Sequence, residues 1–263
     1  MTTRYPKIQI YHPSELLKPW VDSYIILQHR KDGIKDPLLW TIMPDCTGYL
    51  IFHLLTDRSR LSLVGPRSVF KNINRTNRVL TLIVKFKPWG LSGILPFPTS
   101  ELKDTSIPLS QIFGYPAINL KYKLEELARS GDIRSCLKKV ERFIEKHIVN
   151  KKSNPKIEYI SQLVSSNQGL ITVKRMADEM GFSDRYLRKI FSLEVGLSPK
   201  RYSMITRVTN IVKSVDTGSA KDWTNLALSS GYFDQSHMID DFNNLLGESP
   251  EVFINRNNRE EII

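Results

Sequence analysis

The sequence predicts an α+β protein. We expect a β-rich N-terminal domain, a cupin-like barrel or a sandwich with flanking helices, followed by an all-α C-terminal domain. Short apolar runs separated by turn residues fill the first hundred residues, which is typical of barrels and sandwiches. From residue 155 onward apolar residues recur at helical spacing. This helical part also contains an internal repeat, which indicates two copies of one supersecondary unit. The expected domains are 1–150 and 155–256.

Five strands are expected in the N-terminal domain. Their apolar or alternating runs are separated by turn residues, including those from Asn72 to Asn77. The strands are predicted at 24–30, 38–43, 49–55, 61–65 and 79–86. The proline-rich stretch 88–116 is predicted to be mostly loop and short helix.

Two helices are expected to close the N-terminal domain, at 118–129 and 132–149. The second places an apolar stripe at spacings of three and four residues. From the sequence, this stripe can pack against its own domain or between two subunits. A homodimer is therefore an open expectation. The following segment, 151–155, is interpreted as a hinge.

The repeat in the C-terminal part aligns Ala177–Phe182 with Ala227–Tyr232 at an offset of fifty residues. Further along, the offset is fifty-one. The later matches are Phe191, Gly196 and Ser198-Pro199 against Phe242, Gly247 and Ser249-Pro250.

The first copy, 172–195, has the pattern of a helix-turn-helix. Thr172 is a suitable N-cap for the first helix, Gly181 suits a turn with positive φ, and Ser183 is a suitable cap for a helix over 184–195. This second helix has an apolar face and a basic outer face. Such a helix has the dimensions to enter the major groove of DNA.

The second copy, 222–245, repeats the pattern with different side chains. Its turn is expected at Gly231 and the cap of its second helix at Asp234. The residues expected to face inward are Trp223, Leu226, Ala227, Met238, Phe242 and Leu245.

Two stretches of the C-terminal part resemble the DNA-binding domain of the AraC/XylS family of bacterial transcription regulators. They are ADEMGFSDRYLRKIFSLEVGLSPKRY (177–202) and LALSSGYFDQSHMIDDFNNLLGESPEVF (226–253). The resemblance covers roughly 155–256 and implies two helix-turn-helix units joined by a central helix, here 199–215. At ~1.5 Å per residue that helix is on the order of 25 Å long. This length suits two recognition helices about one DNA turn apart, roughly 34 Å.

The N-terminal domain also resembles a recurring domain of uncharacterised AraC-type regulators. The matching stretches are MPDCTGYLIFHL (43–54), LVGPRS (63–68) and KFKPWGLSGILPFPTSELKD (85–104). The resemblance implies a sequence-specific DNA-binding regulator, an activator that contacts RNA polymerase. It also implies an N-terminal half that senses a small-molecule effector or mediates dimerisation, but it indicates no particular ligand.

Carrying the family pattern onto this chain identifies residues that would contact DNA. Arginine can pair with guanine and Gln235 with adenine, while His237 can contact DNA or only pack on its neighbours. The base-reading candidates are Ser183, Asp184, Arg185, Arg188, Lys189, Gln235, Ser236, His237 and Asp240. The phosphate-contacting candidates are Thr172, Arg175, Lys200, Arg201 and Lys221.

Charge is distributed unevenly along the chain. The formal net charge of +11 suggests a polyanionic partner. It divides into +12 over 1–169, +5 over 170–215 and −6 over 216–263. Where many family members carry a basic residue, this chain has Asp240 and Asp241. We therefore expect the first unit to supply most of the affinity for DNA.

Four aromatic residues of the N-terminal domain are candidates for an apolar effector pocket. The alternative, ordinary aromatic residues of a strand core, applies to each of them. The four are Trp40, Phe52, Phe86 and Trp89. His12, His29 and His53 lack the spacing of metal ligands, so no metal is expected, and no cofactor motif was recognised.

Two other function classes are weighed beside DNA binding. One is an enzyme with a DNA-binding tail, whose chemistry needs a zinc cluster or an activated thiolate. Cys46 and Cys136 lie far apart in apolar settings, so no enzyme is expected. The other is a protein-interaction regulator with little DNA affinity, suggested only by the acidic second unit. No membrane span or signal peptide is predicted, and we expect a cytoplasmic, nucleoid-associated protein.

Overall fold

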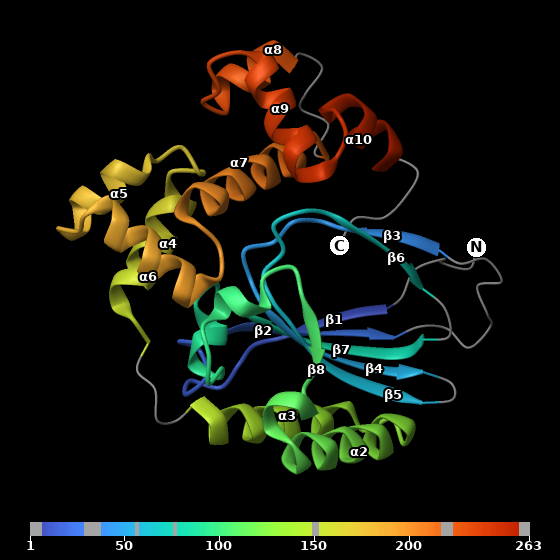
Figure 1. The fold of residues 1–263 in the computed structure, drawn as a ribbon. Coiled ribbons are helices and arrows are strands. Elements are labelled where there is room, and N and C mark those ends of the chain that lie inside the picture. The colour runs from blue at the N-terminus through green and yellow to red at the C-terminus, as the bar shows by residue number, and fades with distance from the viewer. Residues whose placement is uncertain are drawn as a thin grey trace.

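A computed structural model describes residues 7–28, 38–55, 58–75, 78–148, 153–216 and 223–257. Figure 1 shows a layer of helices at the bottom, β-sheets in the middle and a helical domain at the top and left. This arrangement confirms the α+β class, with strands in the first half of the chain and helices in the second.

The main sheet is antiparallel and has six strands in the order β1-β2-β7-β4-β5-β8. Side chains of β4 alternate between buried and partly buried, so one face of the sheet lies on the core. In the described residues β1 and β8 each pair on one side only, so this sheet is not closed into a barrel. The strands are β1 Lys7–Tyr11, β2 Val21–Gln28, β4 Tyr49–Leu55, β5 Ser59–Val64, β7 Arg78–Phe86 and β8 Ser106–Pro108.

A second sheet consists of β3 (Leu38–Ile42) and β6 (Lys71–Arg75). The turn predicted from Asn72 onward is wrong, because residues 72–75 lie in β6. Asparagine is rare in strands, but Ile73 of β6 pairs with Trp40 of β3 along a continuous antiparallel register. The pairing partner therefore overrides the local preference for a turn.

Helices α2 (Tyr115–Arg129) and α3 (Ile133–Ile148) pack against each other, and α2 also packs on β4 and β5. Within the single chain, Leu137, Val140 and Ile144 of α3 are buried. The apolar stripe of this helix therefore packs against its own domain. The elements before α2 are the short helices η1 (Gly90–Gly93), η2 (Thr99–Leu102) and α1 (Ser110–Phe113).

The C-terminal domain contains seven helices among the residues that the structure describes. The long α7 crosses between α5 on one side and α8 on the other (Figure 1). No helix in the described parts of the chain is long and apolar enough to cross a membrane. The helices are α4 Pro155–Ser166, α5 Val173–Met180, α6 Asp184–Val195, α7 Pro199–Asp216, α8 Trp223–Ser229, α9 Gln235–Leu246 and α10 Pro250–Asn257.

Candidate nucleic-acid interface

The first helix-turn-helix unit consists of α5 and α6, and its helix ends are set by short polar side chains. Thr172 Oγ1 accepts a hydrogen bond from the backbone N–H of Arg175 at 3.2 Å. Gly181 ends α5 with φ +65. Ser183 Oγ then accepts from the backbone N–H of Tyr186 at 3.3 Å and begins α6. These are the cap and turn positions that the sequence predicts.

Helix α6 has two distinct faces. Leu187, Phe191 and Val195 are buried, and α6 packs against η1 and η2 of the N-terminal domain as well as against α5 and α7. The opposite face carries exposed side chains, and three of them are basic within five residues. The exposed candidates of this unit are Ser183, Asp184, Arg185, Arg188 and Lys189. All five predicted base-reading residues of the first unit are therefore exposed at the start and in the first half of α6.

The second unit consists of α8 and α9 and has the same backbone plan. Asp234 Oδ1 accepts from the backbone N–H of His237 at 2.8 Å and begins α9. Ser236, His237 and Asp240 are exposed, and the His237 ring packs edge-on against Tyr232. Gln235 is half-buried, and its side-chain oxygen accepts from Thr224 Oγ1 at 3.1 Å. Gln235, Ser236 and His237 therefore lie at the start of α9 and Asp240 lies in its middle, but none of these side chains is Lys or Arg.

Asp241 lies in the core of the second unit, only 4% exposed, and does not face outward beside Asp240. Its carboxylate accepts from the Tyr232 hydroxyl at 3.0 Å. Burial and this carboxylate raise the pKa of the Tyr232 phenol well above its ordinary value. The guanidinium of Arg207 lies 4.6 Å from the centre of the Tyr232 ring. Asp241 therefore belongs to a buried polar pair and adds no carboxylate to the exposed face of α9.

Phe233 is a residue of this surface that the sequence reasoning missed. Its side chain is 87% exposed and lies directly before the cap residue Asp234. The repeat contained a signal for it, because Phe233 is the extra residue that changes the offset from fifty to fifty-one between Tyr232 and Asp234. An exposed phenylalanine at the start of a recognition helix offers an apolar contact for a thymine methyl group.

The phosphate candidates fall into three groups. Thr172, Arg175 and Lys200 are exposed on the helical domain. Lys221 lies outside the described residues. The prediction that Arg201 contacts phosphate is wrong, because its guanidinium contacts the N-terminal domain and is not free for phosphate.

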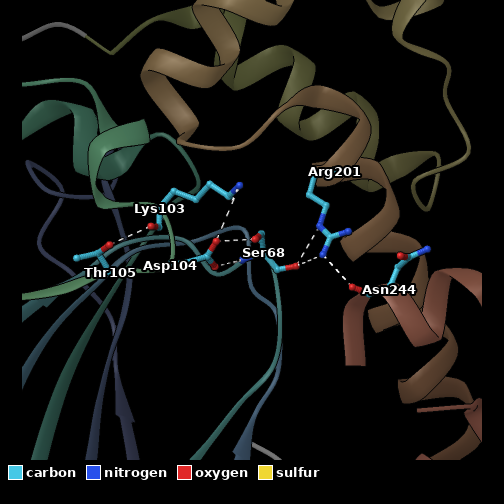
Figure 2. A network of polar contacts seen from close by, with 6 residues as sticks. All are labelled: Ser68, Lys103, Asp104, Thr105, Arg201 and Asn244. Atoms are coloured by element: carbon cyan, nitrogen blue, oxygen red, sulfur yellow. Dashed lines mark hydrogen bonds and ion pairs between the residues drawn. The ribbon is translucent and has the colours of Figure 1, made fainter. Parts of the chain in front are cut away.

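The contacts of Arg201 join three segments of the chain. Its Nε donates to the backbone oxygen of Ser68 at 3.0 Å, and Nη2 donates to the same oxygen. Nη2 also donates to the backbone oxygen of Asn244 at 3.2 Å. Figure 2 shows this guanidinium between Ser68 and Asn244. Partial burial lowers the pKa of Arg201, although two acidic residues oppose this effect.

The aromatic candidates for an effector pocket lie in the core. Phe52 and Phe86 are 0% exposed, and Trp89 is 4% exposed and donates from Nε1 to the backbone oxygen of Pro19 at 2.9 Å. This placement matches ordinary strand-core aromatics. The side chain of Trp40 lies outside the described residues.

The two cysteines do not have the environment of an activated nucleophile. Both are buried. Burial raises the pKa of the Cys136 thiol to about 11 and also raises that of Cys46. An activated thiolate requires the opposite shift. The described residues also contain no group of three or more His, Cys, Asp or Glu side chains that could hold a metal ion.

Comparison with protein families finds two matches that lie in different domains. Residues 176–256 match a model described as "Helix-turn-helix domain". Residues 9–108 match a model described as "Domain of unknown function (DUF6597)". No curated protein matches the chain.

Comparison with solved structures finds one protein titled as a probable AraC family regulator and several structures of ToxT. A probable AraC family transcriptional regulator from Rhodopseudomonas palustris CGA009 is 23% identical, with TM-score 0.35, over 39% of this chain and 97% of its own. ToxT from Vibrio cholerae O395 is 13% identical, with TM-score 0.43, over 96% of this chain and 98% of its own. ToxT from strain SCE256 with a bound unsaturated fatty acid is 13% identical, with TM-score 0.39, over 97% of this chain and 96% of its own.

Proposed function

We propose that the chain is an AraC-type helix-turn-helix transcription regulator that binds operator DNA mainly through α6, with α9 as a weaker second reader; the match of residues 176–256 to a helix-turn-helix family model supports this. The observation that carries this proposal is the exposed basic face at the start of α6. That face includes Arg185, Arg188 and Lys189 beside the cap residue Ser183.

The start of α6 has the chemistry that base recognition requires. An arginine that pairs with guanine O6 and N7 contributes about 1–3 kcal/mol of discrimination. The free backbone N–H groups at a helix start also suit a phosphate oxygen. Lys200 and Arg175 are exposed nearby in sequence and would add phosphate contacts.

The start of α9 offers weaker contacts. Gln235 can address adenine, and Ser236 and His237 can donate to base edges or phosphates. Phe233 adds apolar surface at the same place. No side chain of α9 is a lysine or arginine, so this helix gains little from the charge of the phosphates.

Three further parts of the proposal rest on the family resemblance. We propose that the protein activates transcription through contact with RNA polymerase, which in vitro transcription from a mapped promoter tests. We also propose control by a small-molecule effector at the N-terminal domain, which a thermal-shift ligand screen tests. Gel filtration with light scattering tests whether the regulator is a homodimer.

A salt titration tests DNA binding itself. Replacing Lys200, an exposed phosphate-contacting candidate, with alanine is expected to make the slope of log K against log salt shallower by about 0.9, because one phosphate contact is lost. The measurement is fluorescence anisotropy of the full chain on a labelled duplex at several salt concentrations.

The matched control for this titration is Lys146→Ala, which removes the same charge from the exposed face of α3 in the N-terminal domain. It is expected to leave the slope unchanged. A wild-type affinity that does not respond to salt contradicts DNA binding and favours a protein-interaction regulator.

A further inference from the structure

One short segment of the N-terminal domain, residues 66–70, contacts both helix-turn-helix units. We call it the brace segment; it connects β5 to β6. Its backbone is held in place by Asp104, whose two carboxylate oxygens accept from the backbone N–H and the hydroxyl of Ser68, each at 2.6 Å (Figure 2). The backbone of Arg67 also pairs with that of Asp45. The segment is therefore anchored within its own domain.

The brace segment meets the first unit at Gly196, directly after α6. A Cβ atom at Gly196 would lie 2.7 Å from Cγ of Pro66 and 3.0 Å from the backbone oxygen of Thr99. Separations of this size are too short for ordinary van der Waals contact. Only a glycine allows the end of α6 to come this close to the N-terminal domain.

The same segment meets the second unit at the end of α9. The backbone N–H of Phe70 donates to the backbone oxygen of Leu245 at 3.0 Å. A Cβ atom at Gly247 would lie 2.7 Å from Cε1 of Phe70. Arg201 completes the connection, because it donates both to Ser68 of the brace segment and to Asn244 of α9.

These two contacts are equivalent in the internal repeat. Gly196 and Gly247 each end the second helix of their unit with positive φ, fifty-one residues apart. Five consecutive residues of the N-terminal domain therefore hold the same point of both recognition helices. The candidate reading residues lie in the first halves of these helices, with Ser183 at the N-cap of α6, and all of them except the half-buried Gln235 are exposed.

We propose that the brace segment sets the distance and orientation between the two recognition helices, with Phe70 and Arg201 as positioning residues. This inference rests on the proposed function, because two recognition helices must match successive major grooves roughly 34 Å apart. Holding them in place before binding lowers the ordering cost of forming the complex. The LVGPRS stretch that marks the N-terminal domain thereby acquires a role in DNA recognition.

The direct test measures the distance between the units without DNA. Spin labels are attached at Lys189→Cys in α6 and Asn243→Cys in α9, both exposed positions. The two native cysteines are buried, which favours labelling at the introduced sites. Pulsed electron paramagnetic resonance is expected to give one narrow distance distribution in the parent chain and a broadened or shifted one after Phe70→Ala.

The matched control is Val69→Ala, which shortens an exposed apolar side chain of the same segment. It is expected to keep the narrow distribution. Arg201→Leu is the second test variant, used if Phe70→Ala does not fold, and is expected to broaden the distribution as well. Unchanged distributions in folded Phe70→Ala and Arg201→Leu overturn the proposal.

A DNA measurement separates this inference from the proposed function. The full chain and Phe70→Ala are titrated on operators with the native spacing and with one base pair inserted between the half-sites. For each chain we compare the Kd on the operator with the inserted base pair with the Kd on the native spacing. We expect this ratio to be closer to one for Phe70→Ala than for the full chain. If Phe70→Ala binds more tightly than the full chain at both spacings, the positioning role is wrong. The brace segment then makes a contact that opposes DNA binding. If no chain binds DNA but the distances change as expected, the proposed function fails and the positioning role stands.

Discussion

The first unit, α5 and α6, and the second, α8 and α9, place different side chains on equivalent points of the same backbone plan. The first has the partly buried Phe182 and Ile190 packed against its core, where the second has the buried Tyr232 and Asp241. On the exposed face, the lysine at 189 corresponds to Asp240. The comparison shows that the two units share their helix caps and most of their apolar core. They differ in one pair of packed side chains and in the charge of the exposed face.

The shared core residue provides the largest expected effect. Phe191 and Phe242 are equivalent, and both side chains are completely buried. Truncation of either one to alanine is expected to cost about 3–5 kcal/mol, because each removes a large apolar side chain and leaves a cavity. Denaturant unfolding of the full chain measures both losses. If one variant loses less than half as much free energy of unfolding as the other, the two phenylalanines are not equivalent in their units.

A smaller effect is expected where the cores differ. Tyr232→Phe removes the donor to the buried Asp241 carboxylate and is expected to cost about 1–3 kcal/mol. The double variant Tyr232→Phe with Asp241→Ile introduces the apolar pair of the first unit and is expected to recover most of this loss. The measurement is a double-mutant cycle by denaturant unfolding. Purely additive effects of the two substitutions contradict a coupled pair.

The local features of the two units could be predicted from the sequence because they depend on neighbouring residues. Thr172, Ser183 and Asp234 each cap a helix through a backbone N–H three residues away. The burial of Asp241 could also be predicted from the spacing of apolar residues in α9. It lies three residues after Met238 and four before Leu245, which places it on the apolar stripe of α9.

The remaining features depend on contacts between distant parts of the chain. Arg201 appeared free for phosphate because its partner, Ser68, lies 133 residues away. Strand β6 appeared to be a turn because its asparagines are poor strand formers, and only the pairing with β3 makes it a strand. Such features follow from contacts between residues that are distant in sequence, within one domain or between the two, which local spacing does not encode.

The central claim is that the first unit supplies most of the affinity for DNA. The most direct test is a titration of Arg188→Ala and Gln235→Ala, in the full chain, on an operator found by genome-wide mapping of bound sites. Arg142→Ala, an exposed arginine on α3, is the control for loss of charge. We predict that Arg188→Ala raises Kd by about 10–100-fold, as expected for losing a guanine contact. Gln235→Ala should have a clearly smaller effect, and equal losses from the two variants would contradict the account.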